Sequence, residues 1–251
     1  MRPFVSIVYP VRDNLVWFSK SIDSFVSTTT NKKDVEILLK VDSDEDCSPY
    51  INILRESGFN YKLIISDRLS GFRDIQKFQT YLCKISIGDF IIISSDDLIM
   101  HTDDWVSKLK PVYSLFDDHI MVCAFSKIRI NKYGTKKCKV SNKIPVVSRQ
   151  WFKYCGYISP ARQTDKYLYQ LGTRINRYLC VHGISISFNL SQTIKKKHLN
   201  RYVSQEGDTE RWSTSLDFHT KELMSHIIPQ KVNFPEGICF SYIKGTEGTE
   251  L

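Results

Sequence analysis

Two aspartates stand side by side at positions 96 and 97, directly after an apolar run, in the stretch GDFIIISSDDLIM. The run at 90–93 is typical of a strand that is buried on both faces. Adjacent carboxylates repel each other, so they need water, a cation or a helix end beside them. Acidic residues do suit the start of a helix, but Asp103 and Asp104 lie closer to the next expected helix. Carboxylate oxygens are the ligands that magnesium and manganese prefer, and we therefore predict a divalent metal site at Asp96 and Asp97.

Polar residues follow three other apolar runs in the same half of the chain. They are Arg12-Asp13, Asp42-Ser43-Asp44 and Ser66-Asp67-Arg68. In a parallel sheet the carboxyl ends of the strands meet at one edge, and ligands gather there. The four polar strand ends therefore predict one binding site at that edge.

The elements that must position these residues alternate along the first half. Apolar runs predict strands at 4–9, 35–41, 61–65, 90–93 and 120–125, and amphipathic patterns predict helices at 15–27, 51–57, 72–87 and 103–116. Gly58 is the expected stop of the second helix. Strands and helices that alternate at this spacing indicate right-handed βαβ units, and hence an α/β fold with a largely parallel sheet.

The pattern loosens after residue 125. Residues 127–143 are basic and are expected to be turn-rich, a helix is expected at 163–172, and a strand at 180–190. Residues 191–211 are polar, carry Lys195-Lys196-Lys197, and are expected to form a mobile loop. A lysine run of this kind is most often solvated, although it would also suit a donor diphosphate or an anionic acceptor.

Composition limits the class of protein. A chain of 251 residues, 42% hydrophobic and 25% charged, is long enough for one large α/β domain, or for one domain with a modest appendage. No stretch approaches the roughly 20 apolar residues that span a bilayer. Seven cysteines lie singly, without Cys-x-x-Cys spacing, which argues against a zinc site or a disulfide framework and favours a reducing, cytoplasmic location. The net charge of +8 suits polyanions such as nucleotide phosphates, anionic lipid surfaces or nucleic acid.

The stretch at 88–98 resembles the metal-binding strand end of family-two glycosyltransferases of the GT-A fold. The usual form there is Asp-x-Asp, whereas Ser94 occupies the first aspartate position in this chain. The resemblance implies that Asp97 is a metal ligand, and that Asp96 contacts the donor ribose or completes the metal shell. The resemblance also implies that Ser95 belongs to the nucleotide-sugar site.

Other stretches match this family in order. Residues 5–13, VSIVYPVRD, resemble its first strand and the proline turn that holds the base, which implies a role for Pro10, Arg12 and Asp13. Asp42 corresponds to the aspartate that reads the imide of uracil; a solvated turn residue is the alternative. Arg73, in SGFRD at 70–74, is implied to reach the nucleotide or diphosphate, with an exposed surface arginine as the alternative.

A segment of the second half resembles the acceptor side of the family. It comprises an aromatic-rich stretch at 146–157 and TDKYL at 164–168, which implies that Asp165 is the general base. Inverting transfer needs a carboxylate that takes the proton of the acceptor hydroxyl; an N-terminal helix cap is the other reading of Asp165. Related enzymes often place a metal-binding histidine after the following strand, but Ser187-Phe188-Asn189 offers none, and His182 and His198 are weaker candidates.

Together these features predict a GT-A fold, a three-layer α/β/α arrangement around a mostly parallel sheet. We expect residues 1–190 to form the glycosyltransferase domain, with a nucleotide-sugar half at 1–125 and an acceptor half at 126–190. Residues 191–251 are expected to form an extension packed on it. The resemblance implies a metal-dependent (Mn2+ or Mg2+), inverting transfer from a nucleotide-diphosphate sugar, UDP-linked by preference, to a hydroxyl of an acceptor such as a glycan.

Three alternatives differ in chemistry. A nucleotidyltransferase would carry a glycine-rich loop after its first strand, and residues 9–14 contain no glycine. A degenerate domain would bind nucleic acid or an anionic glycan through its basic surface, and a transferase acting on modified DNA would suit the same charge. Binding that depends steeply on salt and ignores sugar nucleotides would identify the degenerate domain.

Overall fold

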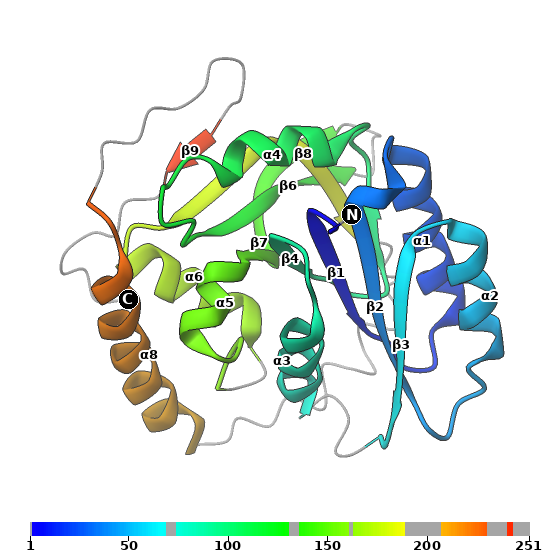
Figure 1. The fold of residues 1–251 in the computed structure, drawn as a ribbon, viewed down its shortest axis with the longest axis horizontal. Helices are drawn as coiled ribbons and strands as arrows, with labels where there is room; N and C mark the ends of the chain where they lie inside the picture. Colours follow the sequence, from blue (N-terminus) through cyan, green and yellow to red (C-terminus); the bar gives the residue numbers. More distant parts are fainter. Residues whose placement is uncertain are drawn as a thin grey trace.

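The computed structural model describes residues 2–68, 74–130, 136–160, 163–188, 207–229 and 240–242. One nine-stranded sheet runs through these residues, in the order β3-β2-β1-β4-β7-β6-β8-β5, with β9 paired to β8 (Figure 1).

The first half builds the parallel part of the sheet. Its strands are β1 (Val5–Pro10), β2 (Val35–Asp42), β3 (Asn60–Ser66) and β4 (Phe90–Ile93), which pair in parallel. The connections contain α1 (Leu15–Thr28), the short 3-10 turn η1 (Lys32–Asp34), α2 (Ser48–Ser57) and α3 (Ile75–Ile85). Gly58, at φ 73°, ends α2 as expected, because glycine enters the left-handed region without a steric penalty. The predicted alternation of strands and helices is confirmed in this half.

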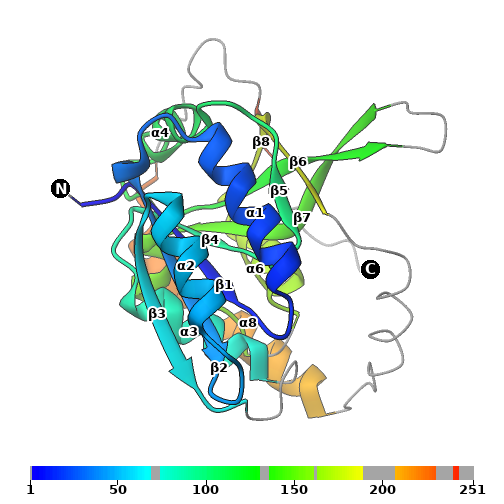
Figure 2. The same cartoon turned by 90° about the vertical axis from the view of Figure 1, so that its right-hand side faces the viewer.

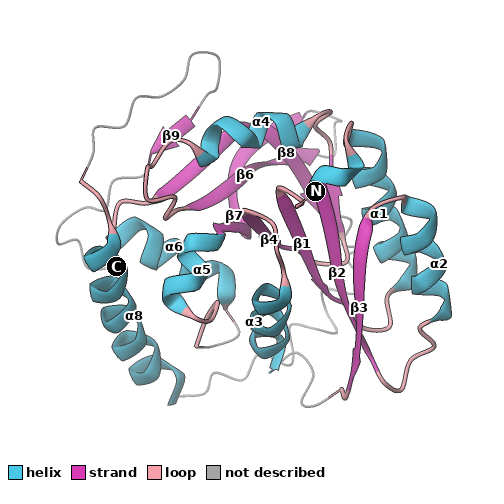
Figure 3. Cartoon of the chain, viewed as in Figure 1, coloured by secondary structure: helices cyan, strands magenta, loops and turns pink. Residues whose placement is uncertain are grey.

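Helices cover both faces of the sheet, which gives three layers (Figure 3). One face packs against α1, α2 and α4 (Trp105–Tyr113), with Phe18, Phe25 and Trp105 in its core. The other face packs against α3, α5 (Arg149–Cys155), α6 (Thr164–Arg174) and α8 (Gly207–His226), around Trp151 and Tyr167. The predicted three-layer α/β/α arrangement is confirmed.

The second half adds strands of both directions. They are β5 (Leu98–Met100), β6 (Val122–Ile130), β7 (Lys136–Ser148), β8 (Tyr178–Phe188) and β9 (Phe240–Tyr242). β6 and β8 run with the first four strands, whereas β5, β7 and β9 run against them, so the sheet is mixed and mostly parallel.

Two expectations for the second half are wrong. Residues 127–130 and 136–143 are not turns but strand residues of the β6–β7 hairpin, whose outer part projects from the body (Figure 2). Its basic residues lack the apolar alternation that marks a half-buried strand. The predicted loop at 191–211 is helical from Gly207 onward, and residues 191–206 lie outside the described part of the chain.

The C-terminal elements join the same body. In α8, His219 accepts or donates a 2.7 Å hydrogen bond with the Tyr167 hydroxyl of α6, and Asp217 pairs with Arg174 at 2.6 Å. β9 pairs antiparallel with β8. None of the described helices combines the length and the apolar character that crossing a membrane requires.

Candidate functional site

The turns that follow β1, β2, β3 and β4 meet at the carboxyl edge of the sheet. Backbone hydrogen bonds continue the strand pairing into them: Val11 donates to Lys40 (3.0 Å), Ser43 to Ser66 (2.9 Å) and Ser94 to Val8 (3.0 Å). The sheet therefore brings the four polar strand ends together, as expected for parallel βαβ units.

The turn after β4 holds the two adjacent aspartates. Asp97 is only 7% exposed, and its Oδ1 accepts a 2.6 Å hydrogen bond from the hydroxyl of Ser95. The turn is closed by Leu98, whose backbone N–H donates to the Ser95 carbonyl at 3.2 Å. Ser95 thus orients Asp97, while Ser94 is buried beneath the turn.

Asp96 accepts a hydrogen bond from the side-chain amide of Asn14, the residue that precedes α1. Burial raises the pKa of Asp96 to about 6; the Asn14 bond lowers the pKa and the charge of Asp97 raises it. Within the described ranges, no ion pair involves Asp96 or Asp97. Two largely buried carboxylates without a cationic partner form an arrangement that a bound divalent cation would stabilise.

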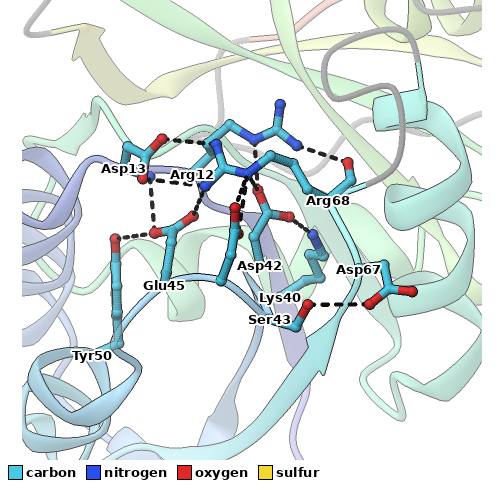
Figure 4. A network of polar contacts seen from close by, with 10 residues as sticks. Arg12, Asp13, Lys40, Asp42, Ser43, Glu45, Tyr50, Asp67 and Arg68 are labelled. Carbon is cyan, nitrogen blue, oxygen red and sulfur yellow. Dashed lines mark hydrogen bonds and ion pairs between the residues drawn. The ribbon is translucent and has the colours of Figure 1, made fainter.

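Asp42, at the end of β2, lies in a compact network of charges (Figure 4). It is 1% exposed and forms ion pairs with Lys40, which is 3% exposed, and with Arg12 Nε at 2.6 Å. Burial lowers the pKa of Lys40, and the charge of Arg12 lowers it further. The Lys40 ammonium also lies 4.0 Å from the centre of the Phe78 ring in α3. Each carboxylate oxygen of Asp42 is thus paired with a cation, Oδ1 with Lys40 and Oδ2 with Arg12.

Arg68, just after β3, ties the neighbouring turns together (Figure 4). It contacts four carboxylates, namely Asp13 (2.9 Å), Asp42 (3.4 Å), Asp44 (2.8 Å) and Glu45 (3.6 Å). The Arg12 guanidinium also donates to the Arg68 carbonyl at 2.8 Å. Asp13 has a φ of 46°, a left-handed conformation that aspartate tolerates.

One acidic group other than the Asp96–Asp97 pair has the spacing of a metal site. Among the described residues, the ligand atoms of Asp42, Asp44 and Glu45 lie within 4.8 Å of one another. The guanidinium of Arg68 contacts all three carboxylates. Arg12 and Lys40 also pair with Asp42, so three cations face the three carboxylates, and we assign no metal to this group.

An open pocket of about 430 Å³ lies between the turns after β1 and β2, lined by residues 13–16, 44–46 and 49–50. Its size falls within the range of small-molecule sites, about 300–1,000 Å³. The Tyr50 hydroxyl and the Asp13 backbone N–H both donate to Glu45 at its rim, at 3.1 and 3.0 Å.

Asp165 lies in the first turn of α6 and is half-buried. Since α6 precedes β8, which runs parallel to β6, the helix begins at the carboxyl edge of the sheet, where the acidic turn also lies. The Thr164 hydroxyl donates to Gln79 of α3 at 2.8 Å and fixes this helix start. Asp165 therefore lies at the predicted edge, on the face covered by α3.

The structure brings Pro10, Arg12, Asp13 and Asp42 into one group, and places Ser95, Asp96 and Asp97 in the adjacent turn. Arg73 lies outside the described residues, and so does His198. Sequence reasoning missed Lys40 and Asn14 as contributors, and it named Arg68 only as part of a polar strand end. Lys40 had a signal, because a lone lysine in the apolar run at 35–42 needs a partner once that run is buried.

No family model matches the sequence, and no curated protein matches it. Solved structures do match the fold. S. aureus TarS 1–349 in complex with UDP-GlcNAc superposes with a TM-score of 0.60 and 13% identity, over 87% of this chain and 66% of that one. The chain spans only 43% of another TarS structure's length.

Two further structures share the fold. The mannosyltransferase PcManGT from Pyrobaculum calidifontis, in complex with GDP-Man and Mn2+, gives a TM-score of 0.58 at 10% identity, over 90% of this chain and 73% of that one. GalNAc-T7 with UDP, GalNAc and Mn2+ gives 0.55 at 11% identity, over 74% and 44%. The predicted GT-A fold is confirmed by these glycosyltransferase neighbours.

Proposed function

We propose that the protein is a metal-dependent glycosyltransferase that moves a sugar from a nucleotide-diphosphate donor to an acceptor hydroxyl. The observation that carries this proposal is the acidic turn of Asp96 and Asp97, which is largely buried and forms no ion pair with the described residues. It lies at the carboxyl end of β4 in a fold shared with proteins solved with nucleotide sugars and Mn2+.

The donor set suits Mn2+ or Mg2+. Asp97, held by Ser95, and Asp96, held by Asn14, would provide the carboxylate oxygens that these ions prefer. A bound divalent ion supplies charge stabilisation for a leaving diphosphate. No histidine is needed for this assignment, because magnesium-type sites commonly keep water and substrate oxygens among their ligands.

The nucleoside is assigned to the turns after β1 and β2. Asp13 lines the 430 Å³ pocket, Pro10 and Arg12 precede it in the chain, and Asp42 lies at the end of the neighbouring strand, paired with Arg12. Asp42 is 1% exposed, and Arg12 and Arg68 contact its Oδ2, so the imide N–H of a UDP-linked donor would reach its carboxylate once these arginine side chains move toward the diphosphate. Arg73 is proposed to contact the nucleotide or diphosphate.

Asp165 is proposed as the general base of an inverting transfer. Its carboxylate takes the proton of the acceptor hydroxyl while the hydroxyl oxygen forms a bond to the anomeric carbon of the donor. The bond from that carbon to the diphosphate oxygen breaks, and the nucleoside diphosphate leaves with the bonding electrons. Position supports this role, because α6 begins at the carboxyl edge of the sheet.

The test is donor binding. Isothermal titration calorimetry with UDP-GlcNAc, other UDP-sugars and GDP-mannose, each with Mn2+, should give saturable binding for at least one donor, and slow release of free sugar should follow. If no nucleotide sugar bound in the presence of Mn2+ or Mg2+, the proposal would be wrong.

A further inference from the structure

Two arginine side chains cover the carboxylate of Asp42. The Nε atoms of Arg12 and Arg68 lie 2.6 and 3.4 Å from the same oxygen, Oδ2, while Lys40 pairs with Oδ1 (Figure 4). The carboxylate that is proposed to accept the imide N–H of uracil is therefore already in contact with two guanidinium groups. A base reaches it only when these groups take other partners.

The side chain of Arg68 spans several strand ends. Arg68 follows β3, and its guanidinium reaches across the turn after β2 to Asp13, in the turn after β1, at 2.9 Å. The next strand beyond β1 is β4, which leads into the acidic turn of Asp96 and Asp97. Asn14, next to Asp13 in the chain, donates a hydrogen bond to Asp96. The Arg68 guanidinium thus lies one strand away from the proposed metal and diphosphate site.

The ion pairs of Arg68 can be exchanged at low cost. The side chains of Arg12 and Arg68 are each 34% exposed, and two partners of Arg68, Asp13 and Asp44, are exposed as well. Ion pairs in such positions contribute little to stability, because water screens them. Lys40 differs, since it is 3% exposed and stays paired with Asp42 in the interior. The two guanidinium groups are therefore the parts of this network that can move.

The balance of charge favours such an exchange when a diphosphate binds. The ion-pair network contains four carboxylates, Asp13, Asp42, Asp44 and Glu45, and three cations, Arg12, Lys40 and Arg68. The adjacent acidic turn adds further negative charge. A diphosphate bound there would be repelled unless the guanidinium groups turn toward it, and guanidinium groups bind phosphate oxygens in a bidentate manner. Burial and the charge of Arg68 both lower the pKa of Arg12, so another anion beside the two groups is favourable.

We propose that Arg68, together with Arg12, makes recognition of the base conditional on the diphosphate, so that the site selects nucleoside diphosphates over nucleosides. When the diphosphate binds, both guanidinium groups exchange carboxylate oxygens for phosphate oxygens. This exchange uncovers the Asp42 oxygen that accepts the imide N–H of the base. The inference rests on the proposed function and adds a specificity-determining residue to it.

Two simpler roles of Arg68 predict different results. If Arg68 only tied the turns together, its loss would also loosen Asp42 and would weaken the binding of base and diphosphate alike. If it contacted the diphosphate without leaving Asp42, its loss would not change base binding. An exchange predicts opposite signs: tighter binding of the base alone and weaker binding of the diphosphate.

The test measures the base and the diphosphate separately. 5′-Deoxyuridine carries the base and the ribose without phosphate, and its Kd is measured by ligand-observed NMR with and without pyrophosphate, always with Mg2+. The Kd of UDP with Mg2+ is measured by calorimetry. The variants are Arg68→Met, which keeps an apolar stem, and Arg55→Met, the matched control at an exposed position of α2.

We expect pyrophosphate to tighten 5′-deoxyuridine binding to the wild type by about fivefold or more, the usual size of coupling between two ligands. The nucleoside is neutral, so attraction between the ligands does not produce this gain. In Arg68→Met, 5′-deoxyuridine alone should bind about twofold or more tighter than to the wild type, UDP should bind about tenfold or more weaker, and the coupling should largely disappear. Arg55→Met should match the wild type in all three measurements.

The coupling in the wild type needs no substitution, and melting temperatures show whether Arg68→Met is folded. Arg68→Lys, which keeps the charge but not the bidentate fork, should retain only part of the coupling. No coupling in the wild type, weaker 5′-deoxyuridine binding to folded Arg68→Met, or unchanged UDP binding to it would each overturn the inference. Normal UDP binding to the wild type without coupling would contradict this inference alone, whereas failure of every nucleotide and nucleotide sugar to bind the wild type would contradict the proposed function.

Discussion

Asp42 is surrounded by Lys40, Arg12 and Arg68, so a substitution of Asp42 is expected to change the stability of the protein as well as donor binding. Asp42→Asn leaves Lys40, only 3% exposed, without its charged partner in a buried position. Breaking a buried ion pair on one side costs about 3–5 kcal/mol. We expect the free energy of unfolding, from chemical denaturation, to fall by about that amount.

A double substitution separates stability from binding at this position. In Lys40→Met/Asp42→Asn neither buried charge remains, so much of the lost stability should return. Donor affinity should stay low, because the base still lacks its carboxylate acceptor. If Asp42→Asn alone were as stable as the wild type, the ion pair would not hold the turn as the geometry indicates.

Asp165 has a catalytic and a structural reading, and kinetics distinguishes them. Asp165→Asn should lower kcat by about 100-fold or more, in the range of general-base catalysis, with the donor Kd unchanged. Lys166→Gln, at the exposed neighbouring position, is the control and should keep the wild-type kcat. If Asp165→Asn kept the wild-type kcat, Asp165 would have only a structural role at the start of α6.

Among the site residues, the sequence predicted those that directly follow a buried strand. Asp42 and the Asp96–Asp97 pair are recognisable because charges directly after apolar runs are unusual. Arg68 is not, since its role comes from carboxylates on two other turns, and only the parallel pairing of β1, β2 and β3 brings these together. Long-range pairing of this kind leaves no local pattern in the chain.

Among the elements, the turn into β4 depends on Gly88. A Cβ there would meet the Ser6 backbone nitrogen at 2.6 Å and the Val5 carbonyl carbon at 2.7 Å. Gly88→Ala should therefore lower the free energy of unfolding by about 1–3 kcal/mol, as overpacking does.

Gly183→Ala is the matched control in the exposed part of β8, where a Cβ would meet nothing within 4 Å. Its effect should be within about 0.5 kcal/mol or slightly stabilising. Both variants are compared by denaturant unfolding. Equal stability of the two would show that β1 and the turn before β4 do not approach as closely as described.

The packing of α8 should depend on pH through His219. This side chain is 1% exposed, and burial lowers its pKa, although a hydrogen bond to the Cys155 backbone and the charge of Glu222 oppose the shift. Below about pH 6.5, His219 binds a proton in the unfolded chain but not yet in the folded protein. The free energy of unfolding therefore falls as the pH drops below that value.

The measurement is the melting temperature between pH 7.5 and 5.5. The wild type should lose stability toward pH 5.5, and His219→Asn should show a smaller loss over the same interval. An identical slope in the two proteins would contradict the assignment to His219.

The helices and strands that could be predicted from the sequence are those that are well buried. β1, β2 and β4 are buried along their length and appear as apolar runs. The outer part of the β6–β7 hairpin was missed because its residues are basic, and β5 was missed because three residues make too short a pattern. α8 buries few positions, such as Leu216, His219 and Leu223, within a polar sequence.

For the whole molecule, the order of short motifs predicted the GT-A fold, although the sequence identity to these neighbours is only 10–13%. The sheet then explains why distant aspartates form one site.

The central claim is that Asp96 and Asp97 hold a divalent ion for a nucleotide-sugar donor. The most direct measurement is calorimetry of UDP-GlcNAc binding with Mn2+ and with chelator, for the wild type, Asp97→Asn and the exposed control Asp103→Asn. We predict that Mn2+ tightens wild-type and control binding by about tenfold or more, and that Asp97→Asn removes this gain. Equal affinity with and without metal, or an undiminished gain in Asp97→Asn, would contradict the account.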